Sequence, residues 1–154
     1  MTNTLSTRRQ ATQSAAVTAG SLRNDPVYQA FWLLRIGFTV APIAFGLDKF
    51  FHILVNWDRY LAPVIVRHLP WTAHQTMFAV GAIEIVAGLV VLLRPRLGGY
   101  VVAAWLAGII VDLLLIPGFY DVALRDFGLL LAALTLARLA SVFPATFTPT
   151  SARN

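Results

Sequence analysis

Four long apolar runs constrain the fold of this chain more than any other feature of its sequence. They cover residues 28–51, 76–93, 97–116 and 122–143, and each holds between 18 and 24 residues. A helix of that length rises about 1.5 Å per residue and can cross a hydrocarbon core of about 30 Å. The runs are too long and too uniformly apolar for barrel strands, and a lipid-exposed backbone must otherwise be helical. The sequence therefore predicts an all-α fold, a four-helix transmembrane bundle.

The overall composition agrees with a membrane protein. Apolar residues make up 58% of the chain and charged residues 12%, compared with about 45–50% and about 25% in soluble domains. The formal net charge is +5, but the chain has a single lysine, Lys49, and no basic run. We therefore expect the lipid bilayer, and no nucleic acid, as a partner. The absence of cysteine excludes disulfides and thiolate metal sites.

The chain divides into one apolar domain and two polar tails. Residues 1–24 are rich in Ser, Thr, Ala and Gln and predict a disordered tail, although an acid-free start with arginines also fits a transit peptide. Residues 25–144 form the predicted transmembrane domain, which opens with Asp25 as a helix N-cap and Pro26 at the first helical position. Residues 145–154 form a short C-terminal tail.

The connection between the first two runs, residues 52–75, is long and amphipathic. It contains the aromatic residues Trp57, Tyr60 and Trp71, and Trp and Tyr favour the headgroup region of a membrane. We predict an interfacial segment here, in the form of a short helix or cap on the membrane surface.

The arginines indicate how the bundle is oriented. With four crossings, both termini and the connection between the second and third runs lie on one side. That side carries Arg8, Arg9, Arg23, Arg94, Arg96 and Arg153, and the positive-inside rule places it in the cytoplasm. The sequence thus predicts a multi-pass protein of the cell membrane with both termini cytoplasmic.

Ionisable residues inside the runs are the best guide to a functional site. An unpaired charge at the centre of a membrane helix costs about 2.5–3.5 kcal/mol on insertion scales, so such groups face the bundle interior and pair. The direction of each run brings six of them to the outer half of the bundle: Asp48, Lys49, Glu84, Asp112, Arg125 and Asp126. We predict that they form a polar pocket open to the outer face.

Two interpretations of these charges remain open. In the structural one, Lys49 pairs with Glu84 and Arg125 pairs with Asp112, which neutralises charge and sets helix register. In the functional one, the pocket holds a polar headgroup or relays protons. Glu84 is the deepest carboxylate. The hypothesis is that it exchanges protons with a quinone-like ligand or a transported solute. No set of residues predicts a catalytic group.

The three histidines, His52, His68 and His74, all lie in the outer connection. Their separations of sixteen and six residues form no recognisable ligand pattern. We therefore predict no metal site and regard them as exposed interfacial residues, with no role assigned.

Short motifs in three of the runs resemble the DoxX-like family of small four-helix membrane proteins. They are RIG at 35–37 and FGLDKF at 45–50 in the first run, GAIEIVAGL at 81–89 in the second, and RD at 125–126 in the fourth. The resemblance extends over about residues 30–140. It carries Asp48, Lys49, Glu84, Arg125 and Asp126 at motif positions.

The resemblance implies a membrane subunit that works in electron transfer, since one member belongs to a thiosulfate:quinone oxidoreductase. It implies quinone as the candidate cofactor, and a homo-oligomer or a larger membrane complex as the setting. A thiol-dependent sulfur reaction is not expected here, because cysteine is absent. The alternatives are a structural or assembly subunit and a small oligomeric transporter.

Overall fold

A computed structural model describes residues 24–143, which form an all-helical structure. Its four long helices are α2 (Pro26–Phe51), α4 (Ala73–Leu93), α5 (Pro95–Leu114) and α6 (Tyr120–Leu139). No strand occurs within residues 24–143. The all-α prediction is confirmed for this part of the chain. The two predicted tails lie outside the described residues, apart from residue 24.

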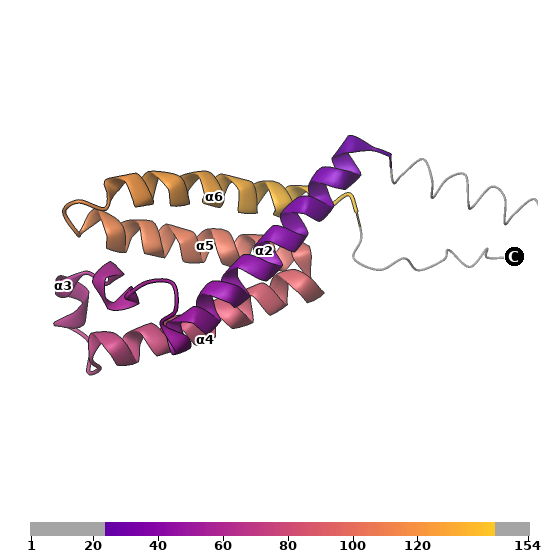
Figure 1. Ribbon diagram of the computed structural model, residues 1–154. Coiled ribbons are helices and arrows are strands. Elements are labelled where there is room, and N and C mark those ends of the chain that lie inside the picture. Colours follow the sequence, from indigo (N-terminus) through magenta and orange to yellow (C-terminus); the bar gives the residue numbers. More distant parts are fainter. Residues whose placement is uncertain (1–23, 144–154) are drawn as a thin grey trace, which may run out of the picture.

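The helices form two close pairs, α2 with α4 and α5 with α6, and α4 packs against α5 to join the pairs. In Figure 1, α5 and α6 lie side by side, while α2 crosses the bundle obliquely and packs along α4. The connection that contains α3 gathers at one end of the bundle, which we call the outer end. The beginning of α2 and the end of α6 lie at the opposite end.

The first helix begins where the sequence predicts. Asp25 is its N-cap, and its side chain accepts a hydrogen bond of 2.9 Å from the backbone N–H of Val27. Pro26 occupies the first helical turn, where its missing N–H has no partner to lose. The sequence predicts this helix start because the cap residue and the proline are adjacent in the chain.

Helix α4 begins three residues before the predicted start at residue 76. Thr72 and Gln75 form a capping box, in which each side chain accepts a hydrogen bond from the other residue's backbone N–H. The first turn it stabilises is polar, so the apolar pattern did not reveal it. The capping signature itself is present in the sequence as Thr-x-x-Gln.

Three of the long helices, α2, α4 and α5, are long and apolar enough to cross a membrane. The fourth, α6, is 20 residues long but carries Asp121, Arg125, Asp126 and Arg138. Large apolar side chains are exposed on the outer faces of the helices, among them Leu33, Val40, Val86 and Val111. Such extensive apolar exposure indicates a lipid environment. Three of the four predicted spans are therefore confirmed as helices able to cross a membrane, and the four-span bundle stays a prediction.

Two glycines allow α2 and α4 to approach closely. A Cβ atom at Gly46 would lie 2.6 Å from the carbonyl oxygen of Gly81, and one at Gly81 would lie 2.8 Å from that of Gly46. Small residues at such crossings let helix backbones meet in lipid. Lys49 and Glu84 each follow one of these glycines by three residues, so the close crossing brings these two charges together.

The outer connection folds into two short helical turns across the ends of the long helices. After α2 the chain forms η1 (Trp57–Tyr60) and α3 (Pro63–Val66). Ala62 lies between them, is fully buried, and donates its backbone N–H to Asp112 on α5. The predicted short helical cap is thus observed, and its place on a membrane surface remains a prediction.

We expect Gly46→Ala to destabilise the bundle by about 1–3 kcal/mol, because the added methyl group meets the backbone of Gly81 and the side chain of Ile85. The matched control is Gly37→Ala on the same helix, where a Cβ meets no atom within 4 Å. Thermal unfolding of both variants in detergent micelles measures the difference. An equal melting temperature for the two would show that the crossing is looser than described.

Candidate functional site

The centre of the site is an ion pair between α2 and α4. Lys49 Nζ donates a hydrogen bond of 2.6 Å to Glu84 Oε2. Lys49 is 3% exposed and Glu84 is 8% exposed, so both charges lie within the bundle and away from lipid. The predicted Lys49–Glu84 pairing is confirmed. Removing either partner of such a pair would leave an uncompensated charge inside the bundle, which is strongly destabilising.

Trp57 joins the ion pair to the outer connection. Lys49 Nζ lies 3.8 Å from the centroid of the Trp57 ring, within the range of a cation–π interaction. The indole Nε1 of the same residue donates a hydrogen bond of 2.6 Å to Asp48 Oδ2. Trp57 was predicted only as an interfacial aromatic, and nothing in the sequence distinguished it from Trp71.

Asp48 holds the first turn of the connection. Its Oδ1 accepts hydrogen bonds of 3.0 Å from the backbone N–H groups of Ile53 and Leu54. Together with the Trp57 indole, these donors satisfy both carboxylate oxygens, and Asp48 is buried. Asp48 therefore positions the connection and has little capacity left for a ligand.

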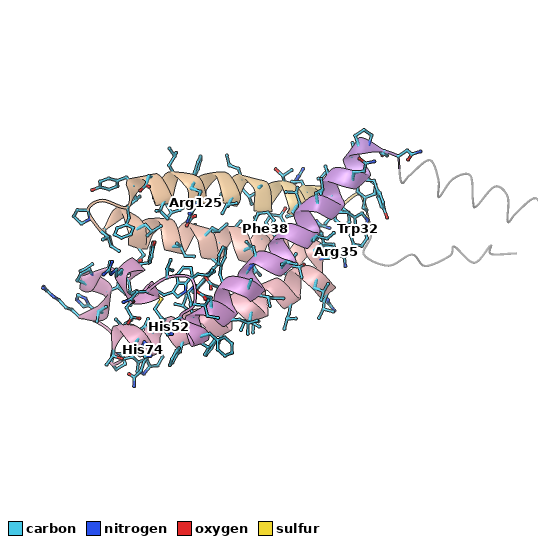
Figure 2. All side chains as sticks on the ribbon, in the orientation of Figure 1. Trp32, Arg35, Phe38, His52, His74 and Arg125 are labelled. Carbon is cyan, nitrogen blue, oxygen red and sulfur yellow. The ribbon has the colours of Figure 1, made fainter. Side chains whose placement is uncertain are left out.

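Asp112 and Arg125 do not form the pair suggested by their depth, and that part of the structural interpretation was wrong. Asp112 accepts the Ala62 N–H at 2.9 Å. Arg125 Nε instead contacts Asp126 Oδ1 at 3.3 Å, and its side chain is 68% exposed. Consecutive helical residues point about 100° apart, so Asp126 faces the interior while Arg125 points outward. Figure 2 shows Arg125 on the α6 side of the molecule.

Two more groups surround the carboxylate of Glu84. Asp126 on α6 is buried and close enough to interact with it electrostatically. The indole Nε1 of Trp105 on α5 is a buried atom near Glu84, and within residues 24–143 it makes no hydrogen bond. All four long helices thus contribute to one polar centre, made of Lys49, Glu84, Trp105 and Asp126. We call these residues the charged centre.

The six predicted residues therefore separate into distinct roles. Lys49, Glu84 and Asp126 lie in the charged centre. Asp48 and Asp112 bind backbone N–H groups of the connection, and Arg125 points outward. Trp105 was missed, because an indole on an apolar helix carries no sequence signal of a polar neighbour.

The opposite end of the bundle has a separate set of contacts. Arg35 donates a hydrogen bond of 2.7 Å to the carbonyl oxygen of Leu92, near the end of α4, and stacks over Trp32 with 4.8 Å to the ring centroid. Figure 2 shows Arg35 and Trp32 far from His52 and His74. An open hollow of about 370 Å³ lies between the end of α4 and the start of α5 and includes Arg94 and Arg96. This hollow is not part of the charged centre.

No family model, curated protein or solved structure matches this chain. The proposed function therefore rests on the geometry of the site.

We expect Lys49→Met to destabilise the protein by about 3–5 kcal/mol, because it leaves the Glu84 carboxylate buried without its cation. The double variant Lys49→Met, Glu84→Met should recover most of that loss, since neither charge then remains unpaired. Chemical unfolding in detergent measures both. Arg125→Met is the control and should cost less than about 1 kcal/mol, because that side chain is largely exposed. Additive losses in the double variant would contradict direct pairing.

Proposed function

We propose that the chain is a four-span protein of the cell membrane, of the DoxX-like kind, with both termini cytoplasmic. Helix α6 packs along α5 and has a similar length, so a membrane crossed by α5 also surrounds α6. The exposed residues of α6 support this, since they include Leu124, Phe127, Leu129 and Leu131. Its charges cluster near its ends, where they reach water or the bundle interior.

The proposed orientation follows from the two ends of the bundle. The end that carries Arg94 and Arg96 joins α4 to α5 and lies opposite the outer connection. Arginine-rich short connections remain in the cytoplasm. The charged centre then lies in the non-cytoplasmic half of the membrane.

We further propose that the charged centre binds the headgroup of a quinone in a membrane complex that transfers electrons. The observations that carry this proposal are a buried lysine with spare donors and a buried indole N–H on α5 near Glu84. The ammonium group of Lys49 has three donors, of which one hydrogen bond, to Glu84, is observed. Trp105 Nε1 is buried without a hydrogen bond among the described residues.

These groups fit the chemistry of a quinone. Its carbonyl oxygens accept hydrogen bonds, and Lys49 and Trp105 would supply them. The bound group would accept two electrons and two protons, with the electrons supplied by a partner protein. Glu84 and Asp126 are carboxylates within the bundle and would hold and pass protons at this position. The chain itself would orient the headgroup and exclude bulk water.

The proposal is tested with Glu84→Gln in the complex isolated with its partners from native membranes. We expect quinone-linked turnover to fall about a hundredfold, because the amide cannot transfer a proton. The complex should stay assembled, since the amide oxygen can still accept from Lys49. Arg125→Gln, at a largely exposed side chain, should leave turnover unchanged. Unchanged turnover in folded Glu84→Gln would contradict the proposal.

A second candidate, a structural or assembly subunit, is favoured by one observation. Trp71, on the outer connection, is 53% exposed, whereas Trp57 donates a hydrogen bond to Asp48. An exposed tryptophan is a frequent anchor in protein interfaces. If assembly is the main role, we expect Trp71→Ala to dissociate a larger complex on native gels while Glu84→Gln leaves it intact. Solute uptake by liposomes that contain this chain alone would instead support a transporter.

A further inference from the structure

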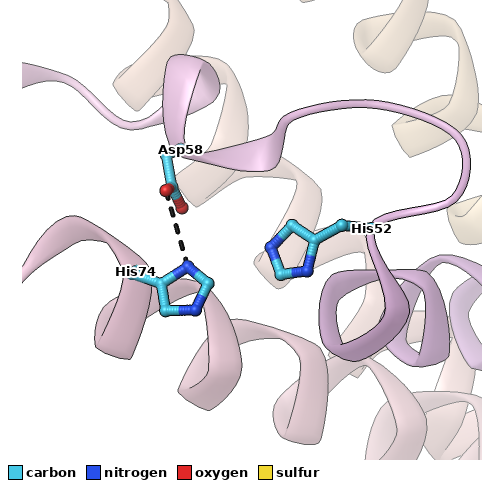
Figure 3. Close-up of side chains that lie close together, drawn as sticks. All are labelled: His52, Asp58 and His74. Atoms are coloured by element: carbon cyan, nitrogen blue, oxygen red, sulfur yellow. Dashed lines mark ion pairs between the residues drawn. The ribbon is translucent and has the colours of Figure 1, made fainter.

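Three side chains from separate elements converge at the outer end of the bundle. They are His52, directly after α2, Asp58 in η1, and His74 in the first turn of α4. One potential ligand atom from each lies within 4.8 Å of the others. Figure 3 shows the two imidazoles and the carboxylate turned toward a common space. His74 Nδ1 lies 3.5 Å from Asp58 Oδ2, the contact drawn as a dashed line.

The backbone at His52 places its ring in this cluster. His52 has φ 54° and ψ 41°, and it is the one residue other than glycine with positive φ between residues 24 and 143. This left-handed cap usually carries glycine, because a side chain there costs about 1–2 kcal/mol. Its backbone N–H donates to the carbonyl oxygen of Asp48 at 2.6 Å, which closes the end of α2. The turn directs the imidazole toward η1 and α4.

Two atoms of the cluster are buried and have no partner. His52 Nε2 and Asp58 Oδ1 make no hydrogen bond within residues 24–143. Buried polar atoms nearly always have a partner in the protein, in water or in a bound ion, so each buried atom without one requires an explanation. An imidazole nitrogen and a carboxylate oxygen are both ordinary metal ligands. These atoms therefore point to a ligand that neither residue finds in the chain.

Aromatic rings surround the two imidazoles on one side. His52 and His74 stack with centroids 5.1 Å apart and planes 20° apart, and Phe78 packs against His74 at 4.5 Å. Phe78 forms an apolar wall on one side of the cluster, and an apolar shell of this kind limits solvent access to a metal site. The only acidic group among the three is Asp58, so an ion would meet one negative charge and two neutral nitrogens.

We propose that His52, Asp58 and His74 bind a divalent transition-metal ion of the zinc class. Two imidazole nitrogens with one carboxylate suit Zn²⁺ and its neighbours, whereas Ca²⁺ and Mg²⁺ prefer oxygen ligands throughout. In a tetrahedral site with bonds of about 2.1 Å the donor atoms lie about 3.4 Å apart. The ligand atoms of the cluster lie within 4.8 Å of one another, so binding would draw the three side chains closer together by about 1 Å. Three protein ligands leave one coordination position open.

The proposed ion would connect the outer connection to both α2 and α4. His52 precedes the turn held by Asp48, and Asp58 follows Trp57 in η1. The ion would thus fix the segment that covers Lys49. This inference does not depend on a quinone, because it concerns residues outside the charged centre.

The test uses the full chain without an affinity tag of histidines, purified in detergent and stripped of metal with a chelator. Titration calorimetry with Zn²⁺ should show one ion per chain, and Co²⁺ should give the intense visible absorption of a low-coordinate site. His52→Ala and His74→Ala should each lower Zn²⁺ affinity at least about a hundredfold. Wild-type protein should also gain thermal stability with Zn²⁺, because the ion binds the folded state.

The matched control is His68→Ala, in the same connection, where the ring nitrogen Nδ1 contacts the carbonyl oxygen of Val64 at 2.8 Å. Its Zn²⁺ affinity and stabilisation should equal those of the wild type. Asp58→Asn replaces His52→Ala if the latter does not fold, and should also weaken binding while keeping the side-chain shape. The proposal is overturned if the wild type binds neither ion, or if these variants bind Zn²⁺ as tightly as His68→Ala does.

Discussion

The structure depends on one buried ion pair between the first two long helices. The chain has a single lysine, and the structure places Lys49 within 2.6 Å of the Glu84 carboxylate, with both residues almost fully buried. In lipid neither charge would be tolerated at a helix surface, so their pairing selects which faces of α2 and α4 meet. The crossing at Gly46 and Gly81 makes that approach sterically accessible. Register between the first two long helices is thus set jointly by charge and by backbone proximity.

The other acidic residues show how the outer end is closed. Asp48 and Asp112 sit at the ends of different helices and accept backbone N–H groups from the connection. The backbone N–H groups of Ile53, Leu54 and Ala62 lie outside regular helices, so these carboxylates supply the acceptors that a helix would otherwise provide. Asp126 and Trp105 are different, because they lie near Glu84 and bind no backbone group of the connection, and the indole Nε1 of Trp105 has no hydrogen bond within residues 24–143. This contrast separates positions that hold the fold from positions available for a ligand.

The sequence predicted the helices and one ion pair because both follow from position along an apolar run. The direction of each helix gives the depth of its residues in the membrane, and depth alone placed Lys49 beside Glu84. Depth does not give the angle around a helix, which is why the Arg125–Asp112 pairing was wrong and Asp126 took the inward position. The convergence of His52, Asp58 and His74 was not predictable, since the connection has no periodicity from which to place side chains. That α6 crosses the membrane, and that the charged centre binds a quinone, are still predictions.

The central claim is most directly tested through the ammonium group of Lys49. Because the chain has one lysine, ¹⁵N labelling of lysine side chains gives a single resonance in the detergent-solubilised protein. A buried ammonium paired with Glu84 should exchange its protons slowly with water and change chemical shift in Glu84→Gln. A resonance that exchanges as fast as free lysine and does not respond to Glu84→Gln would contradict the account.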